Sequence, residues 1–250
     1  IRSHERFLLV SHIRPDCDAL GSELGMAGVL EALGKQVTIV NGHATPHNLA
    51  FIDPHKKIQQ IGADIQPEQL KDVQVLMILD TSAWAQLGEM SPVIKASTAL
   101  KMVLDHHVSE DDLGAELFKN VQAEATGRLV VEAAEHLGVS LTPEISTPLF
   151  AAIATDTGWY HFNSTSAGTY AIASKLVSAG ANPTQIYHDL YEQDTLARLQ
   201  LRGRILARTQ TEIDGRLAHT AVLREDFEAT GAQPTDTEDV VNLTMAVRGV

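Results

Sequence analysis

The sequence contains one cysteine, Cys17, few aromatic residues and no long hydrophobic run. A single cysteine excludes a disulfide within the chain and makes the cytoplasm the default compartment. Aromatic residues form only 5% of the chain, so we expect an aliphatic core. The apolar run near the N-terminus is too short for a signal peptide, and no stretch is long enough to span a bilayer. We therefore expect a cytoplasmic protein that does not enter a membrane.

The sequence also lacks a basic stripe. Its formal net charge is −13, whereas proteins that hold long duplex nucleic acid usually carry a positively charged face. We therefore expect no long duplex as a partner. An acidic protein can still bind a short phosphorylated molecule when bound metal ions supply positive charge at the site.

The chain has 250 residues, 44% of them hydrophobic, which suffices for one large domain and part of a second. Four short, mostly apolar runs are typical of strands that a parallel sheet buries on both faces. These runs cover residues 7–10, 37–40, 73–79 and 100–104. Two segments with apolar residues at helical spacing lie between these runs. They cover residues 19–33 and 84–96, and Pro92 interrupts the second. This alternation predicts an α/β domain with a doubly wound parallel sheet.

The pattern becomes helical after Thr126. The expected helices cover residues 127–137, 143–156, 166–179 and 184–210, and the last of them leads into a linker. A strand at 217–223 and a further element at 239–247 indicate that a second, smaller α/β domain begins near Ile213 and is cut short at Val250. The arginines between 198 and 208 favour a solvated helix face over a nucleic-acid patch, because Glu192 and Asp194 lie beside them.

Three of the four expected strands are followed directly by acids or imidazoles. The carboxyl ends of parallel strands meet at one edge of a sheet, where α/β proteins place their sites. These side chains are therefore expected to gather there, and Asp156, at the end of a helix, could return to the same edge. The candidates are His12, Asp16, Asp18, Asp80, Asp105, His106, His107 and Asp156.

Oxygen-rich ligands with some imidazole suit Mn²⁺, with Mg²⁺ as a harder alternative. Four aspartates are formally balanced by two divalent ions, and two ions roughly 3.5–4 Å apart can hold a bridging hydroxide for in-line attack on a phosphate. The competing interpretation is a set of solvated loop acids and core histidines. One cluster alone would favour that interpretation, but three clusters at strand ends favour a metal site.

These residues resemble the DHH phosphoesterase family. The Asp105-His106-His107 triplet, the segment from His12 through Asp18, the single Asp80 after a strand, and Asp156 match its motifs in order. The resemblance implies one metal ion on His12, Asp16 and Asp80 and a second on Asp18, Asp80, His106 and Asp156, with Asp80 bridging and contributing to catalysis. Asp105 would orient an imidazole, and His107 would contact the substrate phosphate and protonate the leaving oxygen.

Within that family the sequence is similar to the nanoRNase/pAp-phosphatase branch, through Thr155–Trp159 with Asn163–Thr165 and through the segment from Pro46 to Pro54. This implies hydrolysis of short oligoribonucleotides or of 3′-phosphoadenosine 5′-phosphate with two divalent ions, Mn²⁺ first and Mg²⁺ or Co²⁺ as alternatives. It also implies a DHH domain over 1–187, a helical linker over 188–212, and the start of a truncated DHHA1 substrate domain over 213–250. A homodimer is one option.

Two further residues are candidate substrate contacts. Arg14 could reach a phosphate, although a surface role is equally compatible with its position, and His161 could line the site. Cys17 is expected to be a buried structural residue rather than a ligand or nucleophile. The alternatives to the nanoRNase interpretation are an inorganic pyrophosphatase or a cyclic-dinucleotide phosphodiesterase of the same family, and a nucleotide sensor without turnover.

Overall fold

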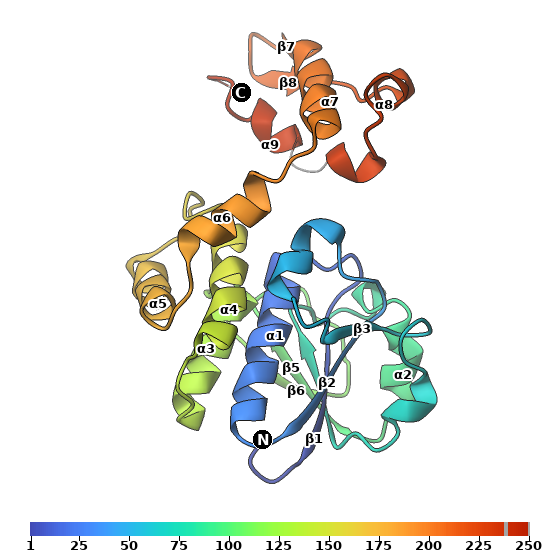
Figure 1. The fold of residues 1–250 in the computed structure, drawn as a ribbon, viewed down its shortest axis with the longest axis vertical. Helices are drawn as coiled ribbons and strands as arrows, with labels where there is room; N and C mark the ends of the chain where they lie inside the picture. The colour runs from blue at the N-terminus through green and yellow to red at the C-terminus, as the bar shows by residue number, and fades with distance from the viewer. Residues whose placement is uncertain (238–239, 250) are drawn as a thin grey trace. The chain divides into compact units, whose positions relative to one another are not determined.

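The computed structural model describes residues 1–237 and 240–249. The chain divides into two compact units, Ile1–Leu190 and Tyr191–Val250. The first unit contains a six-stranded sheet (Figure 1). Its strands are β1 (Arg6–Val10), β2 (Gln36–Asn41), β3 (Ile58–Gln60), β4 (Val75–Leu79), β5 (Leu100–Asp105) and β6 (Glu116–Lys119). All neighbouring strands are parallel, which confirms the α/β prediction.

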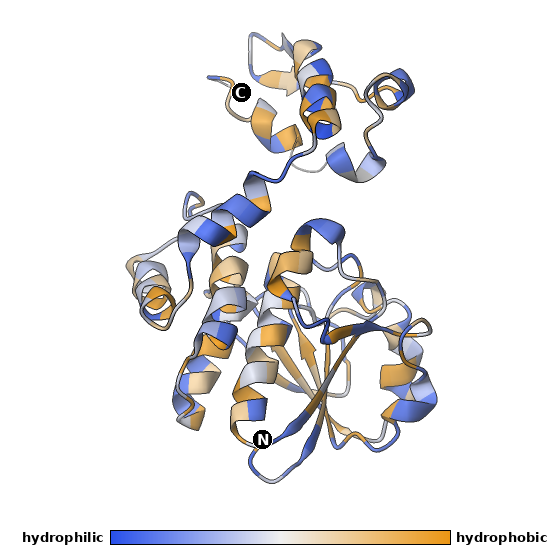
Figure 2. Ribbon diagram, viewed as in Figure 1, coloured by the Kyte–Doolittle hydropathy of each residue, from blue (hydrophilic) through white to orange (hydrophobic). Residues whose placement is uncertain are grey.

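The sheet separates two apolar layers. Alternate residues of β1 and β4 point to opposite faces, so that Leu9 and Met77 join one buried cluster while Leu8 and Ile78 join the other. Helices α1 (Cys17–Ala32), α3 (Thr126–Leu137) and α4 (Pro143–Asp156) cover the first face, and α2 (Met90–Ala96) covers the second (Figure 1). Figure 2 shows the central strands as predominantly hydrophobic, as expected for strands buried on both faces.

The strand order is β3-β2-β1-β4-β5-β6. The chain winds outward from β1 in one direction through β2 and β3, and from β4 in the other through β5 and β6. The order therefore reverses between β1 and β4, and the segments that follow these two strands separate above the sheet. Such a switch point is where open α/β sheets bind their ligands. The predicted site residues after β1 and β4 lie at this position.

Helices α1 and α4 pack closely because α1 presents glycines to α4. A Cβ atom on Gly21 would lie 2.4 Å from the carbonyl oxygen of Pro148, and one on Gly25 would lie 2.4 Å from Leu149 Cδ2. Gly21 also meets Ala152 and Gly28 meets Ile145, so later positions in α1 face earlier positions in α4 and the helices are antiparallel. The N-terminal end of α1 thus lies beside the C-terminal end of α4, which carries Asp156.

Two further helices complete the first unit, α5 (Ala167–Ser178) and α6 (Pro183–Tyr191). The single helix expected over 184–210 is wrong: α6 ends at Tyr191, and α7 (Leu196–Ala207) starts after Thr195, whose hydroxyl accepts a hydrogen bond from the Arg198 N–H at 3.1 Å. A side chain that caps a helix N-terminus in this way favours a new start over continuation.

The second unit contains α7, the antiparallel pair β7 (Gln210–Glu212) and β8 (Leu217–His219), α8 (Arg224–Thr230) and α9 (Val240–Thr244). Its small core includes Leu201 and Ile205 of α7. The strand expected over 217–223 is shorter than predicted, and residue 239 of the element expected at 239–247 lies outside the described residues. Arg198 and Arg202 pair with Asp194, in keeping with a helix face balanced by nearby acids. No helix among the described residues is both long and apolar enough to cross a membrane.

The α1–α4 contact generates a prediction about stability. Replacing Gly21 by Ala places a methyl group against backbone, so we expect a loss of about 1–3 kcal/mol in the free energy of unfolding. Gly203 of α7 is the matched control, because a Cβ there meets no atom within 4 Å, and its replacement by Ala should stabilise by up to about 1 kcal/mol. Urea unfolding of both variants measures the difference. Equal effects at the two positions would contradict the close approach of the helices.

Candidate metal centre

The segment after β1 brings His12 and Asp16 to the switch point. The Nδ1 atom of His12 lies 3.0 Å from the carbonyl oxygen of Ile13. Because a carbonyl can only accept, this contact places the proton on Nδ1 and leaves Nε2 as a free lone pair. His12 Nε2 lies 3.4 Å from Asp80 Oδ2 and 3.8 Å from Asp16 Oδ1. Asp16 is the N-cap of α1 and accepts from the Ala19 N–H at 3.0 Å, so the helix start fixes its position.

Asp80 follows β4 and has a φ of +62°, a left-handed conformation that is uncommon for a residue with a side chain. Its N–H donates to the Leu104 carbonyl at 3.0 Å, and its Oδ1 accepts from the Thr126 hydroxyl at 2.9 Å. Backbone and side chain are thus both held by neighbouring elements. The carboxylate is almost completely buried, and the chain bends there to turn it toward the switch point.

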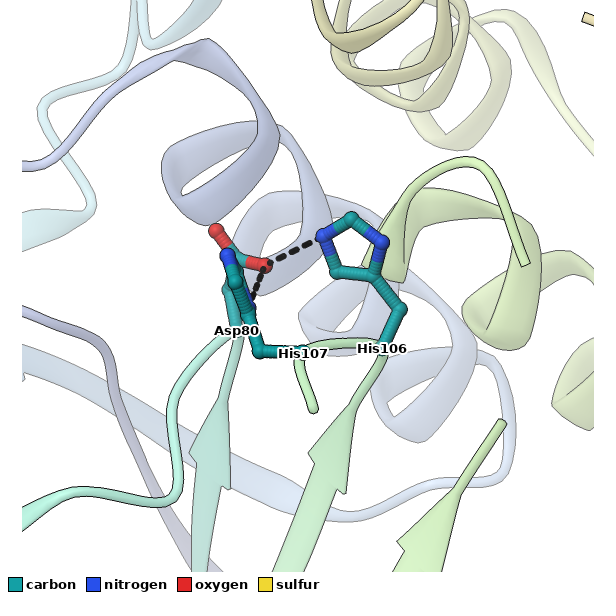
Figure 3. A group of neighbouring side chains, drawn as sticks. All are labelled: Asp80, His106 and His107. Atoms are coloured by element: carbon teal, nitrogen blue, oxygen red, sulfur yellow. Dashed lines mark ion pairs between the residues drawn. The ribbon is translucent and has the colours of Figure 1, made fainter. Parts of the chain in front are cut away.

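The segment after β5 supplies the two histidines of the triplet. His106 Nδ1 lies 3.1 Å from the Ala123 carbonyl, and this contact again leaves Nε2 free. That Nε2 faces three carboxylates, at 3.7 Å from Asp18 Oδ2, 3.5 Å from Asp80 Oδ1 and 3.6 Å from Asp156 Oδ2. In Figure 3 the rings of His106 and His107 both lie against the Asp80 carboxylate, whose Oδ1 is 3.7 Å from His107 Nδ1.

Asp18 is held by the start of α3. Its two oxygens accept from the backbone N–H groups of Thr126 and Gly127 at 2.7 and 2.9 Å, and its Oδ1 also accepts from Ser22 at 3.2 Å. The N-terminus of a helix attracts negative charge. Sequence reasoning did not identify Thr126 or Gly127 as site residues. The available signal was their place at a helix start that follows a strand.

Asp105 is completely buried. Its Oδ1 accepts from both the backbone N–H and the Nδ1 of His107, and its Oδ2 accepts from the Ser82 hydroxyl. Burial alone would raise the pKa of Asp105, but these hydrogen bonds outweigh it and lower the pKa to about 2. The carboxylate is therefore charged at neutral pH, and its hydrogen bond raises the pKa of His107, whose side chain is half exposed.

The other carboxylates repel one another. Burial, followed by the neighbouring charges of Asp18 and Asp16, raises the pKa of Asp156 to about 7. Burial and the nearby Asp18 and Asp16 charges also raise the pKa of Asp80 well above its usual range, and burial raises that of Asp18. Burial without a matching positive charge disfavours the ionised form. These groups therefore form a region that binding of cations would stabilise.

Three sets of donor atoms lie close enough to share an ion. One set joins His12, Asp16 and Asp80, a second joins Asp18, His106 and Asp156, and a third joins Asp80, His106 and His107. The structure thus brings together all six predicted ligands. Carboxylate oxygens with some imidazole nitrogens match the ligand preference of Mn²⁺, whereas Mg²⁺ prefers a set with fewer nitrogens. The donor set and the uncompensated charge of the aspartates both fit divalent cations.

His161 and Cys17 lie outside these sets. Arg14 and His161 are exposed; Arg14 has a φ of +52°, and its N–H donates to His43 Nδ1 at 3.1 Å. Cys17 is buried, and burial raises the pKa of its thiol to about 12. A buried thiol with so high a pKa is a poor nucleophile at neutral pH.

The sequence profile described as the DHH family, N-terminal domain, matches residues 6–153, more than half of the chain. The chain belongs to the DHH family. The resemblance drawn from its motifs is thereby confirmed. The match ends three residues before Asp156, so it spans the segments after β1, β4 and β5 and most of α4.

Curated relatives of this DHH protein are named bifunctional oligoribonuclease and PAP phosphatase NrnA. The one from Thermus thermophilus is 29% identical over 242 residues, which are 96% of this chain and 69% of the relative. The one from Mycoplasma pneumoniae is 28% identical over 216 residues, which are 84% of this chain and 64% of the relative. The chain thus spans about two thirds of the length of these two relatives.

Two solved structures have similar folds. An exopolyphosphatase-related protein from Bacteroides fragilis superposes with a TM-score of 0.93 at 27% identity, over 98% of this chain and 74% of that one. A putative family II inorganic pyrophosphatase from Methanococcus jannaschii superposes with a TM-score of 0.58 at 14% identity, over 95% and 78% of the two chains. The second likeness concerns the fold alone.

The repulsion among the aspartates predicts how stability depends on pH. Asp156 has a raised pKa in the folded state, so the metal-free folded state binds more protons than the unfolded state, and stability should fall as pH rises from about 4 to about 7. Asp156→Asn should reduce that slope. In the wild type Mn²⁺ should raise the melting temperature, and more at pH 8 than at pH 5.5, because protons compete with the ion.

Thermal melts in EDTA and in Mn²⁺ at the two pH values provide the measurement. Asp72→Asn, at an exposed position before the start of β4 and away from the carboxyl ends of the strands, is the control and should keep the wild-type slope and metal shift. A melting temperature that Mn²⁺ leaves unchanged at both pH values would contradict the metal centre.

Proposed function

We propose that this DHH protein is a hydrolase that cleaves phosphate esters of short oligoribonucleotides, of 3′-phosphoadenosine 5′-phosphate, or of both, with two divalent cations, Mn²⁺ first and Mg²⁺ or Co²⁺ as alternatives. The observation that carries this proposal is the convergence of six acid and imidazole ligands at the switch point of the sheet. The names of the Thermus and Mycoplasma relatives support the substrate class.

The two oxygens of Asp80 support a bridging role. Oδ2 faces His12 at 3.4 Å and Oδ1 faces His106 at 3.5 Å, so one carboxylate addresses both groups of ligands. We therefore assign His12, Asp16 and Asp80 to one ion, and Asp18, Asp80, His106 and Asp156 to the other. Ions held there would stabilise the negative charge on the phosphate oxygens and activate a water for attack. Within this proposal Asp80, His107 and Asp105 are the catalytic set.

His107 is suited to protonate the leaving oxygen. Its Nδ1 lies 2.9 Å from Asp105 Oδ1, so the ring is oriented and its Nε2 remains for the substrate. The charge on Asp105 favours the imidazolium, which can donate a proton from Nε2. We further propose that Arg14 and His161, both exposed, contact the substrate, and that residues 213–250 begin a DHHA1 substrate domain after a linker at 188–212.

An inorganic pyrophosphatase is the second candidate function. The ligand set by itself serves a phosphoanhydride as well as a phosphate ester, since both need charge stabilisation on phosphoryl oxygens and an attacking water. The fold likeness to the Methanococcus protein is compatible with that alternative. A cyclic-dinucleotide phosphodiesterase and a sensor without turnover are the remaining alternatives, and the experiment below distinguishes them.

Asp80→Asn tests the proposal. We expect the wild-type protein with Mn²⁺ to release product from 3′-phosphoadenosine 5′-phosphate or a 5′-phosphorylated RNA dinucleotide. The kcat of the variant should fall by more than about 100-fold. That is the largest loss typical of removing a residue that only orients a metal ligand, so a greater loss is expected for a ligand itself. Because Asp80 is a buried acid with a raised pKa, the variant should melt no lower than the metal-free wild type at pH 7.5. Loss of activity would then not reflect unfolding.

Asp72→Asn is the control and should keep full activity. Pyrophosphate, a cyclic dinucleotide and the two nucleotides are offered in parallel. Turnover of pyrophosphate alone would transfer the assignment to the pyrophosphatase class, and turnover of the cyclic dinucleotide alone to the phosphodiesterase class. A metal-loaded wild-type protein that binds nucleotide and turns over none of the four would favour the sensor.

A further inference from the structure

Lys119 and Ser82 form a buried polar network on the side of Asp105 that faces away from His107. Lys119 is the last residue of β6, and the register of the parallel pair places it directly beside Asp105 at the end of β5. Its ammonium group is largely buried and lies 3.5 Å from Asp105 Oδ2. Ser82, two residues after Asp80, donates to the same oxygen at 2.7 Å.

The network also holds the loop that carries His107. The carbonyl oxygen of Ser109 lies 2.8 Å from Lys119 Nζ and 2.7 Å from Ser82 Oγ, and Lys119 Nζ lies 2.9 Å from Ser82 Oγ. Ser82, Lys119 and the Ser109 carbonyl therefore contact one another pairwise, and Lys119 Nζ also lies 3.5 Å from Glu110 Oε2 in the same loop. The loop is held at Asp105 before His107 and at Ser109 after it.

Counting protons shows what each group contributes. A hydroxyl has one proton, so Ser82 cannot donate to Asp105 and Ser109 at the same time. An ammonium has three, and Lys119 can donate to Ser82 and to Ser109 together. Lys119 thus satisfies the Ser109 carbonyl and leaves the Ser82 proton for Asp105 Oδ2. Asp105 Oδ1 remains available to accept from both nitrogens of His107.

We propose that Lys119 and Ser82 are positioning residues for His107, acting through Asp105 and through the Ser109 carbonyl. The polar contacts of the two side chains run to Asp105, Ser109, Glu110 and each other, and none of these partners is a ligand in the three sets. Outer partners that fix an imidazole typically contribute 10- to 100-fold to activity. This inference rests on the proposed function, because it assigns His107 a part in the reaction.

The test compares four variants of the full chain. Lys119→Met keeps the length of the side chain without its charge, Lys119→Arg keeps the charge, and Ser82→Ala removes the hydroxyl. Lys101→Met is the matched control, because Lys101 also lies on the sheet, in β5, but its ammonium donates to the Ser97 carbonyl near the opposite end of the strand. Each variant is measured for kcat and KM on 3′-phosphoadenosine 5′-phosphate and an RNA dinucleotide, and for Mn²⁺ affinity by calorimetry.

We expect Lys119→Met and Ser82→Ala to lower kcat by about 10- to 100-fold, with KM and Mn²⁺ affinity within about twofold of wild type. Lys119→Arg should recover most of kcat, and Lys101→Met should match wild type. Equal loss of kcat in Lys101→Met, or a loss of Mn²⁺ affinity that parallels the loss of kcat, would overturn the inference, since either points to a structural role.

A readout on the metal-free protein separates this inference from the proposed function. The Nδ1 proton of His107, hydrogen-bonded to Asp105, should give a downfield NMR signal that His107→Gln removes. Ser82→Ala and Lys119→Met should shift or broaden that signal, and Lys101→Met should leave it in place. An unchanged signal in both network variants would refute the inference even if the enzyme is active. A wild-type protein that turns over none of the substrates would refute the proposed function, and the NMR signal would still test the network.

Discussion

The site depends on one electrostatic constraint: several carboxylates share a volume from which water is largely excluded. Asp18 and Asp80 are almost completely buried, and Asp156 is raised in pKa to about 7 by burial and by its acidic neighbours. In a protein evolved only for stability such crowding would be removed, because an unpaired buried charge is costly. The repulsion is instead held in place by fixed donors. Thr126 supports both Asp18 and Asp80, and the start of α3 supplies two N–H groups to Asp18.

The fold meets this constraint with rigid elements rather than long loops. Asp80 lies directly at a strand end, while Asp16 and Asp156 lie at helix ends. The glycines of α1 let α4 approach closely enough for its final residue to join the group. Rigid supports matter because carboxylates that repel one another would otherwise separate when the ions are absent. The left-handed backbone conformation at Asp80 adds conformational strain at this position.

Much of this arrangement was predictable from sequence, for a physical reason. The four central strands are short aliphatic runs, and acids or imidazoles at their carboxyl ends must share an edge of a parallel sheet. Strands β3 and β6 were not predicted. They are short edge strands, one of which is largely exposed, so they lack the apolar run that identifies a buried strand. The single helix expected over 184–210 was wrong because residues 192–195 contain no apolar residue and Thr195 caps the start of a new helix. The network of Lys119 could not be predicted, since it depends on the register between β5 and β6.

Three histidines at the site illustrate how one local device serves two kinds of chemistry. In His12, His106 and His107 alike, Nδ1 is bound by an acceptor, so that the ring is oriented and Nε2 is left for another partner. For His12 and His106 the acceptor is a backbone carbonyl, which fixes the tautomer without adding a charge and leaves a lone pair for an ion. For His107 the acceptor is the carboxylate of Asp105, whose charge favours the protonated ring. In the proposed function, the acceptor behind each ring therefore separates the two imidazoles that would hold ions from the one that would give a proton. The proposed positioning roles of Lys119 and Ser82 extend that distinction to the partners of Asp105.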